Sequence, residues 1–273
     1  GGVADKDIIL LDQPDITAFE QALAEIENRL GQTSKEARTE VFFYYSGHAD
    51  ERGLLMGDER LPYQTLRHSL DSMRTDVRIA VLDACASGAI TRIKGGKRRQ
   101  AFMVDQSNTM RGYAFLTSSS ADESAQESDR IGASFFTHYL VSGMRGAADV
   151  SGDGRVTLGE AYQFAFDQTL DQTTGTRGGA QHPAYDISLS GTGDVVITDV
   201  RQTNASLALG AALNGRLFVR DSNQRLVAEL YKPAGRAVEL GLEAGTYSVF
   251  YEPSNQLHHA EINLDSGQRG QLD

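Results

Sequence analysis

One cysteine and one histidine carry the clearest chemistry in this sequence. Cys85 is the only cysteine of the chain and follows an apolar run at 77–84, and His48 follows a second apolar run at 40–46. A thiol becomes a strong nucleophile when it loses its proton, and a neighbouring imidazole can take that proton and pass it to a leaving group. A lone cysteine is more often a buried core residue. The position of His48 relative to Cys85 therefore decides between the two interpretations.

The segments around these residues alternate between strand and helix patterns. Short apolar runs predict strands, and apolar residues at helical spacing predict the helices between them. The expected elements are a strand at 7–12, a helix at 15–30 capped by Asp15 or Thr17, a strand ending at Ser46, a helix at 61–73 starting near Pro62, and a strand at 77–84. This order predicts an α/β fold, a mainly parallel sheet flanked by helices. His48 and Cys85 would then meet at the carboxyl edge of the sheet.

Two motifs resemble those of the caspase-like cysteine peptidases, a family that includes metacaspases and bacterial relatives. They are YYSGH, which contains His48, and VLDACASG, which contains Cys85. Further segments are similar to later parts of the family, at 113–128, 132–149, 152–164 and 181–198. The resemblance covers residues 1–199 and implies a caspase-like peptidase domain there. It also implies that Cys85 attacks the peptide carbonyl while His48 moves the proton.

The same resemblance implies where the oxyanion of the tetrahedral intermediate would bind. The backbone N–H groups of Cys85 and Ala49 are the candidates, because preorganised donors stabilise the developing charge. Most relatives have glycine at the position of Ala49. If the backbone needed a positive φ there, alanine would be strained.

A carboxylate close to the cysteine predicts which substrates are cut. Asp83 lies two residues before Cys85 on the same strand, so both side chains point to the same side and the carboxylate would attract a cation. In metacaspases the matching aspartate lines a pocket for Arg or Lys, which implies the same role here for Asp83 and for Ser46. Asp122, from an acidic loop, is a further candidate. The alternatives are a strand-end cap for Asp83 and solvated loop charges for Asp122.

The most basic segment of the chain offers an internal substrate. KGGKRRQAF spans 94–102, shortly after the cysteine strand, where relatives often have a processing linker. A peptidase that selects Arg or Lys could cut itself after Lys97, Arg98 or Arg99. A solvated basic loop is the equally weighted alternative.

A second motif is independent of this chemistry. DVSGDGRVTLGE, at 149–160, follows the twelve-residue calcium loop of EF-hands. Asp149, Ser151 and Asp153 take positions 1, 3 and 5, Arg155 offers its backbone carbonyl, and Glu160 takes position 12. Ca²⁺ is therefore a candidate ligand, although the peptidase chemistry requires no cofactor. An Asp-Gly turn followed by a threonine cap of the next helix explains much of the same sequence.

The character of the sequence changes after residue 199. Residues 200–273 contain short alternating runs separated by Gly, Pro, Asn and Ser, which predict a small antiparallel β-sandwich. Within 1–199, the strand that begins caspase-like folds has no counterpart. The resemblance therefore implies that the sheet lacks an interior strand. Either a processed or separately supplied N-terminal fragment, which could be the protein's own, completes the sheet as a partner of this chain, or the sequence is truncated.

Composition and charge exclude other classes of protein. The 273 residues include 26 basic and 37 acidic side chains, a formal net charge of −11, which argues against a nucleic-acid partner. No run approaches about 18 apolar residues, so no membrane span is expected. One cysteine cannot form an internal disulfide, and the compartment stays undetermined. The expected partner is a protein or peptide with a basic residue before the scissile bond.

A different functional class stays open at this point. The chain could be an inactive caspase-like scaffold, with the calcium loop or the sandwich recruiting partners and Cys85 a remnant. The presence of both Cys85 and His48 favours the enzyme. The absent first strand favours inactivity of this fragment alone.

Overall fold

The computed structural model describes residues 3–34, 36–85, 87–92, 110–120, 123, 125–128, 131, 133–254 and 256–273. Their contacts divide the chain into two compact units. The N-terminal unit contains Val3–Gln126 and Leu170–Asp194, and the C-terminal unit contains Glu127–Thr169 and Val195–Asp273. No helix in the described ranges combines the length and apolar character needed to cross a membrane.

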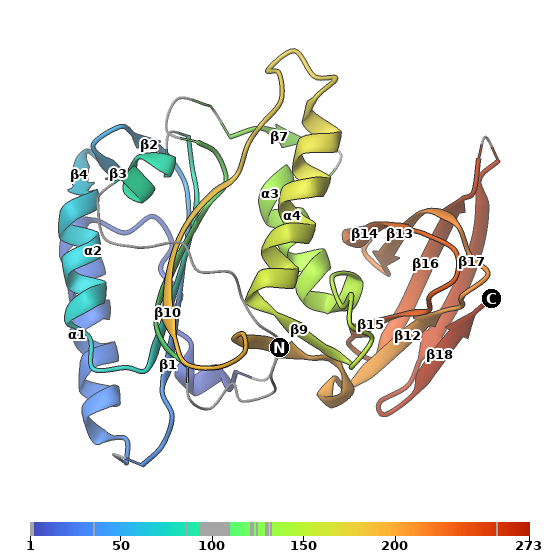
Figure 1. The fold of residues 1–273 in the computed structure, drawn as a ribbon, viewed down its shortest axis with the longest axis horizontal. Helices are drawn as coiled ribbons and strands as arrows, with labels where there is room; N and C mark the ends of the chain where they lie inside the picture. Colours follow the sequence, from blue (N-terminus) through green and yellow to red (C-terminus); the bar gives the residue numbers. More distant parts are fainter. Residues whose placement is uncertain are drawn as a thin grey trace. The chain divides into compact units, whose positions relative to one another are not determined.

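A four-stranded sheet forms the centre of the N-terminal unit (Figure 1). Its strands, in spatial order, are β1 (Glu40–Ser46), β5 (Val77–Asp83), β6 (Arg111–Thr117) and β10 (Ala184–Ser190). The first three are parallel, and β10 is antiparallel to β6. The apolar run of β5 is buried almost throughout, as expected for an interior parallel strand. The predicted α/β fold with a mainly parallel sheet is therefore present.

Two helices cover one face of this sheet (Figure 1). Helix α1 spans Ile16–Gln32, and its predicted cap Asp15 accepts a hydrogen bond from the Ala18 backbone N–H at 2.7 Å. Helix α2 spans Tyr63–Ser72 and begins directly after Pro62. Apolar residues at helical spacing on both helices pack against β1, β5 and β6 in one cluster, which includes Phe19, Leu23, Leu66, Leu70, Val41, Leu82 and Phe115.

The strand predicted at 7–12 is wrong. A short 3-10 helix occupies Asp5–Asp7, and the residues after it form no strand. Ile8 is 53% and Leu10 89% exposed. An apolar run forms a strand only when a neighbouring strand takes its backbone hydrogen bonds and a core takes its side chains, and this segment has neither among the described residues.

A small hairpin connects β1 to α2. It consists of β2 (Ala49–Asp50), β3 (Gly53–Met56) and β4 (Glu59–Pro62), all paired antiparallel. Leu54, Met56 and Leu61 bury the hairpin against the core of the N-terminal unit. The buried hairpin therefore anchors the loop that contains His48.

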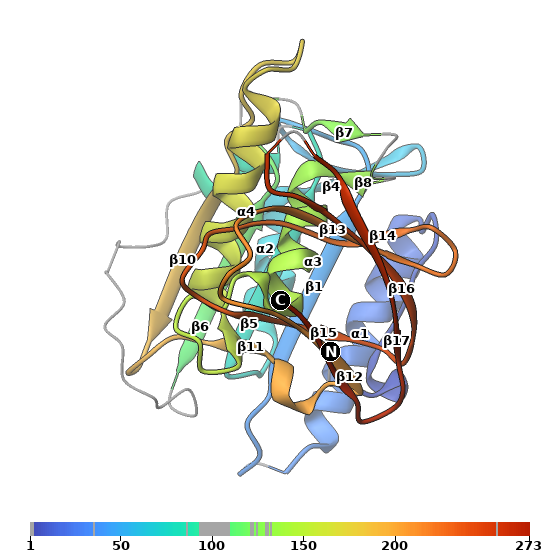
Figure 2. The same ribbon diagram turned by 90° about the vertical axis from the view of Figure 1, so that its right-hand side faces the viewer.

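The C-terminal unit contains two sheets (Figure 2). Buried residues of both sheets form one hydrophobic cluster. The larger sheet has the order β14 (Leu226–Lys232), β13 (Gly215–Asp221), β16 (Gly245–Glu252) and β17 (His258–Leu264). The smaller has the order β15 (Val238–Leu242), β12 (Ala205–Leu209) and β18 (Arg269–Leu272). β12 and β18 pair in parallel, which differs from the all-antiparallel expectation. Every other strand pair in these two sheets is antiparallel.

A helical segment belongs to the same unit. It contains the paired strands β7 (Glu127–Ser128) and β8 (Ala133–Ser134), helix α3 (Phe135–Ser142), a π-helix at Gly143–Ala147 and strand β9 (Arg155–Thr157), which pairs with β11 (Val196–Asp199). Helix α4 (Leu158–Thr173) follows and continues into the N-terminal unit. The compact units thus place 127–169 with the C-terminal strands, whereas the predicted division at 199 places this segment with the peptidase domain.

One glycine permits the close packing of that helical segment. Gly146 has φ +120°, and a Cβ there would lie 2.0 Å from the Glu239 carbonyl oxygen of β15. Only glycine fits this backbone conformation and this approach.

Candidate active site

The register of β1 and β5 places the two chemically important residues at the same strand end. Ser46 and Asp83 are paired across the two parallel strands, and the Gly47 N–H donates to the Asp83 carbonyl oxygen at 3.2 Å. His48 and Cys85 each lie two residues beyond this pair, and both are exposed. The predicted convergence at the carboxyl edge of the sheet is therefore what the backbone shows. The sulfur of Cys85 contacts the Ala125 carbonyl oxygen at 4.0 Å.

A tyrosine that sequence reasoning missed holds the histidine loop. The Tyr45 hydroxyl lies 2.7 Å from the His48 carbonyl oxygen and 2.8 Å from that of Leu55, whose N–H donates to His48. Burial raises the pKa of Tyr45, so the phenol stays a donor. A Cβ at Gly47 would lie only 2.7 Å from this hydroxyl, so glycine leaves room for the tyrosine. The signal in the sequence is the alternation within β1, which turns Tyr45 to the same side as Phe43.

The backbone at the candidate oxyanion position is unstrained. Ala49 begins β2 and pairs with Leu54. Among the described non-glycine residues, only Gln13 and Gln224 have a positive φ. Alanine therefore fits where relatives have glycine, and the role of the Ala49 and Cys85 N–H groups remains a prediction.

Serine hydroxyls from the end of β6 hold the backbone just before the cysteine. The Ala84 N–H donates to Ser118 Oγ at 3.1 Å, and Ser118 Oγ lies 3.3 Å from the Ala84 carbonyl oxygen. Ser119 Oγ lies 3.4 Å from the same oxygen, and the Ser118 N–H donates to Leu82 at 2.9 Å. Both serines are fully buried. The residue that precedes Cys85 is thereby bound on both its N–H and its carbonyl group.

An arginine in a buried ion pair also contacts the short helix that follows the cysteine. Arg67 of α2 pairs with Asp186 of β10, and their side chains are 9% and 11% exposed. The guanidinium also stacks on the rings of Tyr113 and Phe115, with its central carbon 4.9 Å and 4.7 Å from the ring centroids. Its Nη1 donates to the Ile90 carbonyl oxygen at 3.3 Å, within the 3-10 helix Ser87–Arg92.

The predicted specificity residues have different environments. Asp83 is 6% exposed, whereas Ser46, its partner across the strands, is exposed. Asp122 and the segment 94–102, with the predicted self-cleavage residues Lys97, Arg98 and Arg99, lie outside the described residues. The pocket role of Asp83 and Ser46 therefore remains a prediction.

The EF-hand-like loop uses its carboxylates as internal hydrogen-bond acceptors. Asp149 accepts from the Gly152 and Gly154 N–H groups at 2.7 and 2.9 Å, and Asp153 accepts from the Arg155 N–H at 2.8 Å. Asp149 also accepts from the hydroxyl of Ser151 at 3.1 Å. In the described part of the chain, no three His, Cys, Asp or Glu side chains group closely enough to hold a metal ion.

The start of α4 shows the structural alternative for this loop. Thr157 Oγ1 accepts from the Glu160 N–H at 3.2 Å, and Glu160 Oε2 accepts from the Thr157 N–H at 3.0 Å. This reciprocal arrangement is a capping box, which satisfies two backbone donors at a helix start. The turn and cap explain the motif without an ion, and calcium binding remains a prediction.

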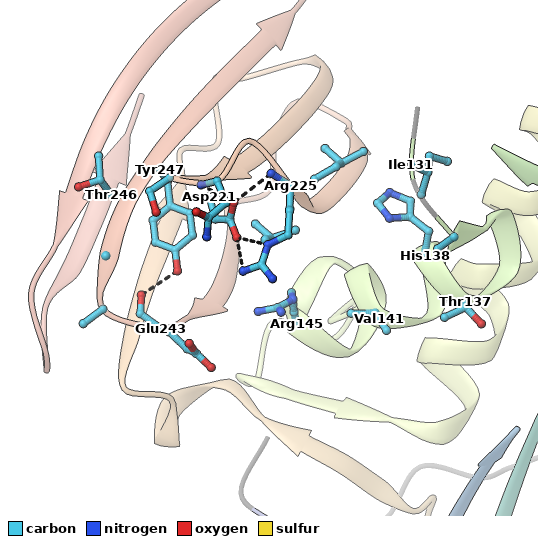
Figure 3. Close-up of a pocket in the computed structure, with 17 residues that line it drawn as sticks. Ile131, Thr137, His138, Val141, Arg145, Asp221, Arg225, Glu243, Thr246 and Tyr247 are labelled. Carbon is cyan, nitrogen blue, oxygen red and sulfur yellow. Dashed lines mark hydrogen bonds and ion pairs between the residues drawn. The ribbon is translucent and has the colours of Figure 1, made fainter. Parts of the chain in front are cut away.

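A cavity of about 500 Å³ lies within the C-terminal unit, between α3 and the β13–β14 and β15–β16 turns (Figure 3). Arg225 is paired there with Asp221 at 2.6 Å, and the Tyr247 hydroxyl donates to the Glu243 carbonyl oxygen at 2.9 Å. None of the predicted catalytic or specificity residues lines it.

A comparison with models of protein families gives a match. The family model described as "Caspase domain" matches residues 5–191. No curated protein matches the chain. The family match covers more than half of the chain and includes both strand ends described above.

Proposed function

The chain belongs to the caspase-domain family of cysteine peptidases, and on this premise we propose that it is an endopeptidase that cleaves after Arg or Lys with a Cys85–His48 dyad. The observation that supports the dyad best is the Ser46–Asp83 pairing, because it brings the two following loops to one edge of the sheet. Both side chains are exposed there, so a substrate can reach them.

The proposed reaction has two stages. His48 takes the Cys85 thiol proton, the sulfur attacks the peptide carbonyl carbon, and a tetrahedral oxyanion forms. His48 then gives its proton to the departing amine as the C–N bond breaks, which leaves an acyl-enzyme. Water, deprotonated by His48, releases the acid product and restores the thiol. The Cys85 and Ala49 N–H groups would stabilise the oxyanion.

Selection of a basic residue is assigned to the carboxylate of Asp83. A buried carboxylate gains much from a cation that reaches it, because the surrounding dielectric is low. Asp83→Asn keeps the size of the side chain and removes the charge. We expect kcat/KM for Arg and Lys peptides to fall about 10- to 100-fold, the range of charged hydrogen bonds. If the ratio of kcat/KM for Arg peptides to kcat/KM for Asp peptides is unchanged in this variant, Asp83 does not select the basic residue.

A panel of fluorogenic peptides tests the activity itself. Peptides ending in Arg, Lys or Asp are assayed with wild type and Cys85→Ala, with and without a calcium chelator. Cleavage of the Arg and Lys peptides by wild type alone supports the proposal. If no peptide is cleaved in a Cys85-dependent way, even with the N-terminal fragment supplied, the inactive scaffold becomes the better account.

Self-processing follows from the same specificity. The loop 94–102 contains Lys97, Arg98 and Arg99, and we propose that the peptidase cuts after one of them. Wild-type protein should then be nicked in this loop, whereas Cys85→Ala protein stays intact. Mass spectrometry of purified protein reads the site, and identical fragments from both proteins would exclude self-cleavage.

The edge of β1 that pairs with no strand among the described residues is the proposed contact for the N-terminal fragment. β1 is at the end of the described sheet order, and Phe42 and Tyr44 on its outward face are 48% and 45% exposed. A strand from the fragment would pair with this edge, and its side chains on the same face would pack beside both rings. Hydrogen exchange of β1 should slow when the fragment is added, with β10, at the opposite edge, unchanged. Equal exchange at both edges would contradict this contact.

Calcium binding at 149–160 stays a separate proposal. Titration calorimetry of wild type and Glu160→Gln tests it, because position 12 supplies two of the oxygen ligands in such loops. Heat released only by wild type would support calcium. The absence of heat from wild type would leave the capping box as the whole role of the motif.

A further inference from the structure

A buried glutamine in the N-terminal unit joins two backbone segments, one bound to Ala84, which precedes Cys85, and one that contacts the Cys85 sulfur. Gln181 precedes β10 and is 0% exposed. Its Nε2 donates to the Ser118 carbonyl oxygen at 2.6 Å, and its Oε1 accepts from the Gln126 backbone N–H at 2.7 Å. A carbonyl can only accept and a backbone N–H can only donate, so these partners fix which way the carboxamide faces.

The first contact acts on the backbone before the nucleophile. The carbonyl of Ser118 is held by Gln181, while the hydroxyl of Ser118 binds the N–H and carbonyl groups of Ala84 at 3.1 and 3.3 Å. Ala84 immediately precedes Cys85. A shift of Ser118 would therefore reach the cysteine backbone through one residue.

The second contact acts on the peptide group that faces the sulfur. The Gln126 N–H and the Ala125 carbonyl belong to one planar trans peptide unit, so they point in opposite directions. Because Gln181 binds the N–H side, it turns the carbonyl toward the Cys85 sulfur, where the distance is 4.0 Å. Orientation of this peptide group is thus transmitted to the nucleophile.

The same segment has two further attachments. The Gln126 side chain donates to the Gly179 carbonyl oxygen at 2.7 Å, and the hydroxyl of Thr176 lies 2.5 Å from its Oε1. Three residues earlier, the Glu123 carboxylate accepts from the His182 N–H and contacts His182 Nδ1, both at 2.8 Å. The turn between α4 and β10 therefore binds Glu123 and Gln126, on either side of Ala125.

We propose that Gln181 is a positioning residue for Cys85, fixing the backbone before the nucleophile through Ser118 and the carbonyl beside the sulfur through Gln126. The proposal deepens the proposed function and rests on it. Gln181 reaches the sulfur only through these two peptide groups. Its removal should leave substrate binding intact and misplace the attacking atom, and misplacement by about 1 Å can reduce a rate on the order of 100-fold.

Gln181→Met is the variant that tests this role, because methionine has a similar length and makes neither hydrogen bond. Gln163→Met, on the exposed surface of α4, is the matched control. With an Arg peptide, we expect kcat of Gln181→Met to fall about 10- to 100-fold and KM to stay close to wild type. The rate of alkylation by iodoacetamide should also change several-fold. Since Cys85 is the only cysteine, this rate reports on its environment alone.

Two further variants keep the proposal testable if the buried substitution unfolds the protein. Thr176→Val removes the hydroxyl contact with the Gln126 side chain, which is less direct than the contacts of Gln181. We therefore expect a smaller loss of kcat, about 3- to 10-fold. Ser118→Ala should be non-additive with Gln181→Met, because both act on Ala84. A folded Gln181→Met protein with wild-type kcat and wild-type alkylation rate overturns the proposal. So does a folded variant whose KM alone changes.

The alkylation rate distinguishes a failure of this proposal from a failure of the proposed function. If wild type cleaves no peptide but Gln181→Met still changes the alkylation rate, Gln181 positions the cysteine and the peptidase assignment fails. If wild type cleaves Arg peptides and Gln181→Met cleaves them equally well, the peptidase assignment stands and the positioning role fails.

Discussion

The two strand ends that meet at the candidate site are held in different ways. On the His48 side, the Tyr45 hydroxyl contacts carbonyl oxygens at sequence separations of 3 and 10 residues. On the Cys85 side, Ser118 reaches Ala84 across 34 residues and Gln181 reaches Ser118 across 63. Apart from the Gly47–Asp83 hydrogen bond between the two strands, the histidine loop is thus held by local contacts, whereas the cysteine side depends on contacts from distant segments of the chain.

This difference has a consequence for chemistry. In the proposed reaction, His48 has to turn between Cys85 and a leaving group, and its backbone needs only a local anchor. The proposed nucleophile, Cys85, needs a defined line of attack, and the buried hydroxyl and carboxamide contacts restrict it. We therefore expect substitutions on the cysteine side to affect both stability and rate, and those on the histidine side of the scaffold to be milder.

The largest expected effect comes from the histidine side chain itself. His48→Ala removes the proposed general base, and we expect kcat to fall about 10²- to 10⁴-fold, the range of general acid–base catalysis. Circular dichroism should be unchanged because His48 is exposed. His68→Ala, an exposed histidine on α2, is the control and should retain wild-type kcat. Activity of His48→Ala within about 3-fold of wild type would contradict the dyad.

Ser118→Ala should have the next largest effect, through stability. The Ala84 N–H would lose its buried acceptor, and an unsatisfied buried donor costs about 1–3 kcal/mol of unfolding free energy. Urea denaturation measures the loss, with the exposed Ser72→Ala on α2 as the control. Equal stability of the two variants would show that the cysteine side does not depend on this contact.

Tyr45→Phe tests the histidine side in the same way. It removes the hydroxyl that contacts the His48 and Leu55 carbonyl oxygens. The Leu55 N–H still binds the His48 carbonyl, so we expect a loss of about 0.5–1.5 kcal/mol of unfolding free energy. Tyr231→Phe in the C-terminal unit, whose ring is exposed, serves as the control. A loss larger than that of Ser118→Ala would reverse the comparison between the two strand ends.

The smallest expected effect is a pH dependence near Glu123. Partial burial raises the pKa of this carboxyl, but hydrogen bonds from the His182 N–H and ring outweigh burial and leave the pKa below its usual value. A lowered pKa stabilises the folded state above the unfolded pKa, and this stabilisation is lost as pH falls through the folded pKa. Glu123→Gln should therefore lose less stability than wild type between about pH 5 and pH 3. If the unfolding free energies of the two proteins fall in parallel over this pH range, Glu123 does not make the expected contribution to stability.

Much of the scaffold was predictable because its signals are local. The helical period and the Asp15 cap predicted α1, and the apolar runs predicted β1 and β5. Alternating runs also predicted several strands of the C-terminal unit, but the parallel pairing of β12 with β18 depends on residues far apart in the chain. The strand at 7–12 failed because apolar character alone supplies no pairing partner.

The site was predictable only in part, for the same reason. His48 and Cys85 could be found because they follow strands, and parallel strands end at one edge. Ser118, Gln126 and Gln181 lie in polar loops, and nothing in their local sequence indicates that they meet. Tyr45 lies in a strand rich in aromatic residues, and the sequence pattern alone predicts that its ring belongs to the core. The contact of its hydroxyl with His48 depends on the conformation of the following turn.

The central claim is that His48 activates Cys85 for attack next to a basic residue. An acyloxymethyl ketone peptide with Arg beside the reactive ketone tests it directly, because the thiolate displaces the carboxylate and forms a stable thioether that intact mass measures. We predict one adduct on Cys85 in wild type, slow labelling in His48→Ala, and little labelling by the matching Asp peptide. Equal labelling rates of wild type and His48→Ala, or no adduct in wild type, would contradict the account.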